Sequence, residues 1–229
     1  KKEETEKGLF DFSGEKLEPL KFSNGKTQAD VVSEVLKAIE EGNKVIFIKG
    51  VCGSGKSAVA LNLARHFKKT AIVVPIKSLQ EQYEKDYTNK NFILKKDNSK
   101  LKISIIKGRN NFRCPFTGER ADSEELPCTI KLTDKNMEQI LRYIGMNKDV
   151  RKEDFTSISD VRRVSIAPAC QYWSPLLPDV VVLKSLKDRR KRKYTAVSGE
   201  YSLFQGKKGC GYYDQYDAYI DSDVLIFNS

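Results

Sequence analysis

Residues 50–57 constrain the fold of this chain more than any other segment. They read G-V-C-G-S-G-K-S and fit the phosphate-binding pattern G-x-x-x-x-G-K-[S/T] without a mismatch. An apolar run at residues 45–48 precedes them, and a helical pattern follows from Ala58. Strand, glycine-rich loop and helix in this order place backbone N–H groups and a helix N-terminus around phosphate oxygens. The segment therefore predicts a nucleotide site in an α/β fold.

The residue types of this loop each have a role in nucleotide chemistry. Lys56 is predicted to reach the β and γ phosphates, and Ser57 is predicted to bind Mg²⁺, so these two are the candidate catalytic residues. The other candidate ATP-binding residues of the loop are Gly50, Gly53, Ser54 and Gly55. We expect ATP and Mg²⁺ as ligands, and we expect Cys52 to be a small loop residue and no ligand.

The residues around the loop alternate between predicted strands and helices. Thr27 and Asp30 resemble a capping signal for a helix that ends near Glu41. The other predicted elements are, in order, a strand at 71–74, a helix at 78–87, a strand at 101–106 and a strand at 223–227. This alternation predicts a parallel sheet with helices on both faces.

The amino-acid composition between Lys107 and Cys210 differs from that of the rest of the chain. This stretch holds four of the five cysteines, a helical patch at residues 137–144 and a basic run at residues 187–193. We therefore predict an inserted, mostly helical, cysteine-containing domain at residues 109–210. It would interrupt a main domain made of residues 1–108 and 211–229. Residues 180–183 fit either a strand or the start of a helix, and the basic run fits either a solvated loop or a DNA contact.

The net charge of +10 and the pI of about 9.2 favour a polyanionic partner. No apolar run reaches the length of a membrane span, and no apolar segment follows the charged N-terminus as it would in a signal peptide. We expect a protein that is cytoplasmic, or nuclear in a eukaryote, and not secreted, with no membrane contact.

Four blocks of sequence carry a family resemblance. They are the phosphate loop, residues 74–82 (V-P-I-K-S-L-Q-E-Q), residues 107–114 (K-G-R-N-N-F-R-C), and residues 210–213 (C-G-Y-Y) leading to 222–228 (S-D-V-L-I-F-N). In this order they resemble the opening motifs of the XPD/DinG family of superfamily 2 iron-sulfur DNA helicases. The resemblance implies a P-loop (RecA-like) first motor domain that is interrupted by an iron-sulfur cluster domain.

The resemblance also implies roles for single residues. Gln28 would contact adenine. The implied DNA contacts are Lys77, Ser78, Gln80, Gln82 and Arg109, and the implied ligands of a 4Fe-4S cluster are Cys114, Cys128, Cys170 and Cys210. Four thiolates suit such a cluster, although a zinc site and free buried thiols are the alternatives.

The implied function is that of the N-terminal part of an ATP-dependent DNA helicase with a role in DNA repair. It would move on single-stranded DNA and unwind forked DNA, and we expect a monomer. The alternatives are a non-catalytic, metal-stabilised nucleic-acid-binding module with a vestigial P-loop, and a P-loop enzyme such as a kinase that acts on small molecules. No apolar strand of the sequence ends in Asp or Asp-Glu, which ATP hydrolysis requires. We therefore expect these 229 residues alone to bind nucleotide weakly without hydrolysing it.

Overall fold

The computed structural model describes most of the chain in two compact units. The described residues are 9–11, 14–88, 90–123, 126, 128, 170–179, 186 and 188–229. The first unit is Lys1–Ile106 with Asp221–Ser229, and the second is Lys107–Ile220. The predicted helical patch at 137–144 and residues 180–183 lie outside the described residues. None of the helices in the described part is long and apolar enough to cross a membrane.

A three-stranded parallel sheet lies at the centre of the first unit. Its strands are β2 (Thr70–Val74), β8 (Val224–Asn228) and β4 (Ile103–Ile105), in the order β2-β8-β4. Thr70 and Ile103 both lie opposite Val224, so the last strand of the chain pairs with both earlier ones. All three strands lie where the sequence predicts them, and the predicted α/β class with a parallel sheet is confirmed.

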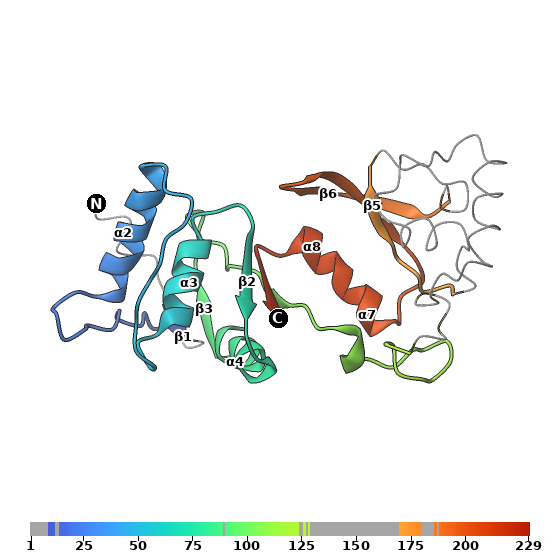
Figure 1. Ribbon diagram of the computed structural model, residues 1–229, viewed down its shortest axis with the longest axis horizontal. Helices are drawn as coiled ribbons and strands as arrows, with labels where there is room; N and C mark the ends of the chain where they lie inside the picture. The colour runs from blue at the N-terminus through green and yellow to red at the C-terminus, as the bar shows by residue number, and fades with distance from the viewer. Residues whose placement is uncertain are drawn as a thin grey trace. The chain divides into compact units, whose positions relative to one another are not determined.

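Three helices accompany this sheet, and each one was predicted. They are α2 (Gln28–Glu40), α3 (Lys56–Ala64) and α4 (Lys77–Tyr87). In the first unit, α4 packs against the sheet and α2 packs beside α3 (Figure 1). Leu61 and Ala64 of α3, Tyr83 of α4, and Val224 and Ile226 of β8 are buried in one core cluster. Residues of both α3 and α4 therefore share a core with β8.

The sequence predicts helices on both faces of the sheet, but one face of strand β2 is exposed. Alternate residues of this strand point to opposite faces, and Ala71 and Val73 are exposed while Val74 is buried. The side chain of Val73 is 64% exposed. A separate two-stranded antiparallel sheet joins β1 (Leu9–Asp11) to β3 (Asn91–Ile93).

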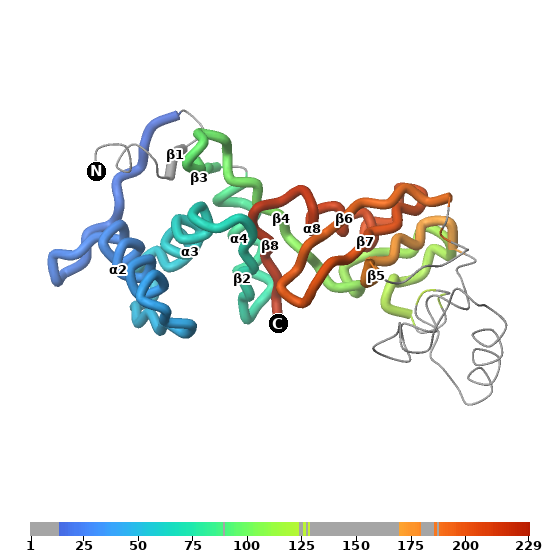
Figure 2. Tube along the Cα trace, turned by 90° about the horizontal axis from the view of Figure 1, so that it is seen from above, coloured from blue at the N-terminus to red at the C-terminus, as the bar shows by residue number. Residues whose placement is uncertain are grey.

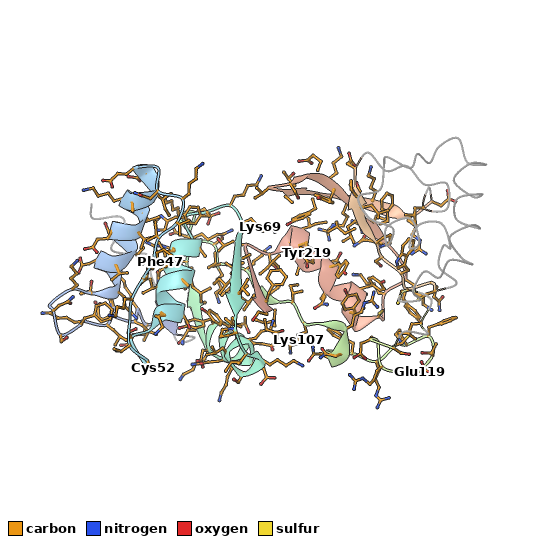
Figure 3. The ribbon with its side chains drawn as sticks, viewed as in Figure 1. Phe47, Cys52, Lys69, Lys107, Glu119 and Tyr219 are labelled. Atoms are coloured by element: carbon orange, nitrogen blue, oxygen red, sulfur yellow. The ribbon has the colours of Figure 1, made fainter. Side chains whose placement is uncertain are left out.

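The strand predicted at residues 45–48 is not formed in the structure. This stretch is assigned to no strand, and the side chains of Val45 and Phe47 are 71% and 93% exposed. Phe47 lies on the segment that leads to α3 (Figure 3). An apolar run becomes a strand only when a neighbour pairs with its backbone N–H and C=O groups, and none of the described strands does so here. The prediction was wrong because strand pairing is not a local property.

The second unit contains a three-stranded antiparallel sheet and a helical run. The strands are β5 (Leu176–Pro178), β6 (Arg190–Ala196) and β7 (Gly199–Gln205), in the order β5-β7-β6. The helical run consists of α7 (Gly211–Asp214), η4 (Gln215–Asp217) and α8 (Ala218–Asp221), and a further 3₁₀ turn, η1, spans Arg109–Asn111. Figure 2 shows the three strands side by side. The described part of residues 109–210 is therefore not mostly helical, and its assignment as an inserted domain stays a prediction.

Residues 190–193 of the basic run lie in strand β6, which pairs with β7 along its whole length. Acidic partners lie beside it: Lys191 and Lys193 pair with Asp179 at 2.6 and 3.6 Å, and Arg192 pairs with Asp217 at 3.2 Å. The hydrogen bond from Lys191 is the main reason that the pKa of Asp179 is lowered to about 2. These four residues are therefore part of a strand and not of a loop, and contact of this run with DNA stays a prediction.

The predicted helix cap at Thr27 is confirmed and can be tested. The Thr27 hydroxyl accepts a hydrogen bond from the backbone N–H of Asp30, and the Asp30 carboxylate accepts one from the backbone N–H of Thr27. We expect Thr27→Ala to destabilise the first turn of α2 by about 1 kcal/mol, because it leaves helix N–H groups without an acceptor. Hydrogen exchange of the first-turn amides measures this change. Thr27→Ser is the control and should keep native exchange rates; equal rates in Thr27→Ala would contradict the expectation.

Candidate functional site

The phosphate loop runs directly into the N-terminus of α3, as the sequence predicts. Gly53 and Gly55 have φ angles of 80° and 69°, a left-handed conformation that favours glycine. Gly55 is the N-cap of α3, so Lys56 and Ser57 occupy its first turn. Cys52 is exposed in the loop before the helix (Figure 3). The loop thus has the backbone conformation that lets N–H groups turn toward a phosphate.

The Lys56 side chain is folded back over this loop. Its ammonium group donates hydrogen bonds to the carbonyl oxygens of Gly50 at 3.1 Å and Val51 at 2.8 Å. The Ser54 hydroxyl donates to the same Val51 carbonyl at 2.9 Å. Phosphate oxygens are charged and accept stronger hydrogen bonds from an ammonium group than carbonyl oxygens do. A bound phosphate can therefore replace the loop carbonyls as the partner of Lys56.

The side chain of Gln28 on α2 is hydrogen-bonded to the backbone of the phosphate loop. Its Nε2 donates to the carbonyl oxygens of Ser54 at 3.2 Å and Gly55 at 3.3 Å, and its Oε1 accepts from the backbone N–H of Leu20 at 3.1 Å. A Cβ on Gly55 would lie 2.0 Å from this Nε2, so the contact requires glycine there. The structure thus places Gln28 against the phosphate loop, and its contact with adenine stays a prediction.

Sequence reasoning missed the role of Tyr83 of α4 in the core. Its side chain is only 5% exposed and belongs to the same core cluster as Leu61 and Ala64 of α3. Burial is the main reason that the pKa of Tyr83 is raised. The one available signal was the position of Tyr83 next to the predicted DNA-contacting residues of the same helix. Helix α4 thus shares its core packing with the helix that begins with Lys56 and Ser57.

The predicted DNA-contacting residues of α4 divide between its surface and its core. Lys77, Ser78 and Gln82 are exposed, whereas Gln80 is 2% exposed. The Gln80 Nε2 donates to the carbonyl oxygens of Ile106 and Ile226, both at 2.9 Å. Gln80 therefore holds α4 against two neighbouring strand segments, and the three exposed residues are accessible to a ligand.

Arg109 lies in the second unit, where its guanidinium group contacts Cys128. Its Nη1 donates to the Cys128 sulfur at 3.2 Å, and its Nη2 donates to the Tyr213 hydroxyl at 3.0 Å. The guanidinium carbon lies 4.1 Å from the centre of the Tyr212 ring. The structure thus places Arg109 beside a predicted cluster ligand, and its contact with DNA stays a prediction.

The four predicted cluster ligands are free cysteines that approach one another in the second unit. Cys114, Cys170 and Cys210 are buried and Cys128 is half-buried. Cys170 and Cys210 share one hydrophobic core cluster, against which Cys128 packs. Cys114 acts electrostatically on both Cys170 and Cys210. Segments that are far apart in the sequence therefore bring these four thiols together.

The surroundings of two of these thiols include hydrogen-bond donors. Burial is the main reason that the pKa of Cys170 and the pKa of Cys210 are raised, and the neighbouring thiols act in the same direction. Backbone N–H groups lower both values: those of Tyr172 and Trp173 at Cys170, and those of Tyr212 and Tyr213 at Cys210. Such donors stabilise a ligating thiolate. Within the described ranges, no group of three Cys, His, Asp or Glu side chains is arranged to hold a single metal ion.

Comparison with known proteins gives one family match. The family model described as "Type III restriction enzyme, res subunit" matches residues 21–159, which include the phosphate loop, α4 and two of the four cysteines. No curated protein and no solved structure matches the chain.

Proposed function

Because the chain belongs to the family of type III restriction enzyme res subunits, we propose that it is the N-terminal part of an ATP-dependent DNA helicase. The family gives the chain a RecA-like superfamily 2 motor domain that uses ATP and acts on nucleic acid. The phosphate loop carries the proposal: two left-handed glycines precede Lys56 and Ser57 on the first turn of α3. Within superfamily 2, the ordered sequence blocks favour the XPD/DinG family.

The conformation of the phosphate loop supports the proposed nucleotide binding. Lys56 exchanges its bonds to the carbonyls of Gly50 and Val51 for bonds to the β and γ phosphates, and the N–H groups at the start of α3 bind the same phosphates. Ser57 supplies a hydroxyl oxygen to Mg²⁺. Gln28 holds the loop carbonyls in place and is the candidate for the adenine contact.

The DNA part of the function is assigned to the outer surface of α4. Lys77 and Ser78 lie on the first turn of this helix, where N–H groups and positive partial charge favour a phosphate, and Gln82 is exposed one turn further on. Gln80 fixes the helix to the sheet and so gives this surface a defined position. Contacts of this kind bind the sugar-phosphate backbone irrespective of base sequence.

The cysteines of the second unit fit a 4Fe-4S cluster as its resident cofactor. Cys114, Cys128, Cys170 and Cys210 would supply the four thiolates that hold such a cluster. Backbone N–H groups at Cys170 and Cys210 and the guanidinium of Arg109 at Cys128 offset the negative charge of these sulfurs. When bound, the cluster supplies covalent cross-links between four distant segments of the chain.

Binding to single-stranded DNA tests the assignment of α4. We expect affinity for an oligothymidylate to fall steeply with salt, because lysine–phosphate contacts release counterions. Lys77→Ala should weaken binding several-fold and reduce the slope of log affinity against log salt by about 0.7. Fluorescence anisotropy over a salt series measures both quantities. The matched control is Lys85→Ala, an exposed lysine in the last turn of the same helix; identical slopes for the two variants would remove Lys77 from the interface.

A further inference from the structure

We propose that strand β6 is a second contact for the phosphates of single-stranded DNA, and that the carboxylate of Asp179 competes with those phosphates for the lysines of the strand. The inference rests on the proposed function, because it takes single-stranded DNA as the partner of the chain. It adds a surface in the second unit, outside residues 21–159 that the family model matches, together with a control on the affinity of that surface.

The basic side chains of β6 divide between the two faces of its sheet. Lys191 and Lys193 share one face and Arg192 lies on the other, because alternate residues of a strand point the same way. Arg192 is bonded to Asp217 of η4 and its side chain is only 22% exposed. The side chains of Lys191 and Lys193 are 42% and 71% exposed. The two lysines are therefore accessible to a partner, whereas Arg192 is engaged within the unit.

The carboxylate of Asp179 offsets part of the charge on the lysine face. Asp179 follows the last residue of β5, and its oxygens lie 2.6 Å from the ammonium nitrogen of Lys191 and 3.6 Å from that of Lys193. The hydrogen bond from Lys191 holds the pKa of Asp179 at about 2, so the carboxylate is charged at physiological pH. One negative charge thus faces two positive charges, and a phosphate that approaches the lysines meets a competitor.

Asp179 has further partners that do not involve the lysines. Its Oδ1 accepts a hydrogen bond from the Ser202 hydroxyl at 2.5 Å, and its backbone N–H donates to the carbonyl oxygen of Glu200 at 2.9 Å. Both of these groups belong to β7, which lies beside β6 (Figure 2). The carboxylate therefore keeps a hydrogen-bond donor when the lysines turn to a phosphate. Exposed ion pairs contribute little to stability, so this exchange of partners costs little.

A strand of nucleic acid fits this surface because its charges repeat. Lys191 and Lys193 are two residues apart on one strand, which places their Cα atoms about 6.6 Å apart in a row. A DNA strand carries one phosphate per nucleotide and gains affinity for each lysine that displaces a counterion. The net charge of +10 favours the approach of such a polyanion. Lysines in a row thus bind neighbouring phosphates irrespective of base sequence.

Asp179→Asn tests the proposal because it removes the competing charge and keeps an oxygen that can accept the Ser202 hydrogen bond. The matched control is Asp122→Asn, which removes the same charge from an ion pair with Arg120 in the same unit, where the two groups are 2.7 Å apart. A third variant combines Asp179→Asn with Lys193→Ala. Fluorescence anisotropy measures binding of an oligothymidylate to each 229-residue chain over a salt series, and thermal melts followed by circular dichroism check folding.

We expect Asp179→Asn to raise the affinity for the oligothymidylate by about 3- to 10-fold at low salt, and to steepen the slope of log affinity against log salt by about 0.7, the effect of one more phosphate contact. Asp122→Asn should stay within about twofold of the wild type, with the wild-type slope. The combined variant should return to the wild-type slope, because it loses the lysine that the first substitution releases.

Lysine acetylation gives a second measurement on the wild-type chain, which needs no substitution to fold. Acetic anhydride labels exposed lysines, and mass spectrometry locates the labels. The oligothymidylate should reduce labelling of Lys191 and Lys193 several-fold, because bound phosphates cover their ammonium groups. Lys37, an exposed lysine in the last turn of α2, is the control and should keep its labelling rate.

Three results overturn the inference while the proposed function stands, each with a wild-type chain that binds the oligothymidylate. They are unchanged affinity and slope in a folded Asp179→Asn variant, an equal gain in Asp122→Asn, and unchanged labelling of Lys191 and Lys193 in the bound chain. Tighter binding of polyglutamate than of the oligothymidylate by Asp179→Asn would overturn it too, and would make an acidic peptide the partner of β6. A wild-type chain that binds no oligothymidylate at low salt overturns the proposed function itself.

Discussion

Lys56→Ala is expected to weaken nucleotide binding by about 100-fold or more, because it removes the ammonium group that bonds to the β and γ phosphates. In the structure this group bonds only to loop carbonyls of Gly50 and Val51 among the contacts described for it, so its loss leaves the fold of the loop largely in place. Titration of a fluorescent ADP analogue with Mg²⁺ measures the change. Circular dichroism of the variant should match that of the wild type.

The control for this variant is Lys49→Ala, which removes an exposed lysine directly before the loop. Lys49→Ala should bind nucleotide within about twofold of the wild type. Retained nucleotide affinity in Lys56→Ala would contradict the assignment of the loop. A wild-type chain that binds oligothymidylate with strong salt dependence but no nucleotide would favour the non-catalytic binding module. A chain that binds nucleotide but no DNA would favour a small-molecule P-loop enzyme.

Cys210→Ser is expected to abolish the iron-sulfur cluster. Anaerobically purified wild-type chain should be brown and contain about four iron and four sulfide per chain. Cys210 is buried in the core cluster with Cys170, and its replacement removes one of four thiolates at the point where N–H donors from Tyr212 and Tyr213 converge. The variant should therefore lose most of its iron and unfold at a lower temperature, because binding energy of a structural metal group is folding energy.

Cys52→Ser is the matched control, because Cys52 is an exposed cysteine outside this group. It should keep its iron, its sulfide and its colour. A colourless wild-type protein with about one zinc per chain would contradict the cluster and favour the zinc alternative. A metal-free protein in which Cys114, Cys128, Cys170 and Cys210 all react with an alkylating reagent after unfolding would favour free thiols.

The features predicted from sequence are those that depend on neighbouring residues. The cap of α2 needs only Thr27 and Asp30, and the phosphate loop needs only its own glycines and lysine. The buried strands β2 and β8 are short apolar runs between turns, and α4 shows helical composition throughout. These local signals were sufficient for the α/β class and for the position of the phosphate loop before α3.

The features that sequence reasoning missed depend on partners far along the chain. Strand β6 consists mainly of basic residues, and it is stabilised by Asp179 and Asp217, which no local pattern connects to it. Gln80 was predicted to contact DNA, and Tyr83 directly follows that block of sequence. The helix buries both side chains, with Gln80 bonded to the carbonyls of Ile106 and Ile226 and Tyr83 in the core cluster. The periodicity of a helix gives its buried face only when the neighbouring elements are known.

The exposed stretch at residues 45–48 has a consequence for how the chain behaves in solution. Consecutive β-branched and aromatic residues with free backbone groups are the kind of segment that nucleates aggregation when chains meet. Lys44 and Lys49 border the stretch on either side, and both are exposed. Charges in these flanking positions act as gatekeepers, because two stacked copies would bring like charges together. Lys44 and Lys49 therefore oppose aggregation through residues 45–48.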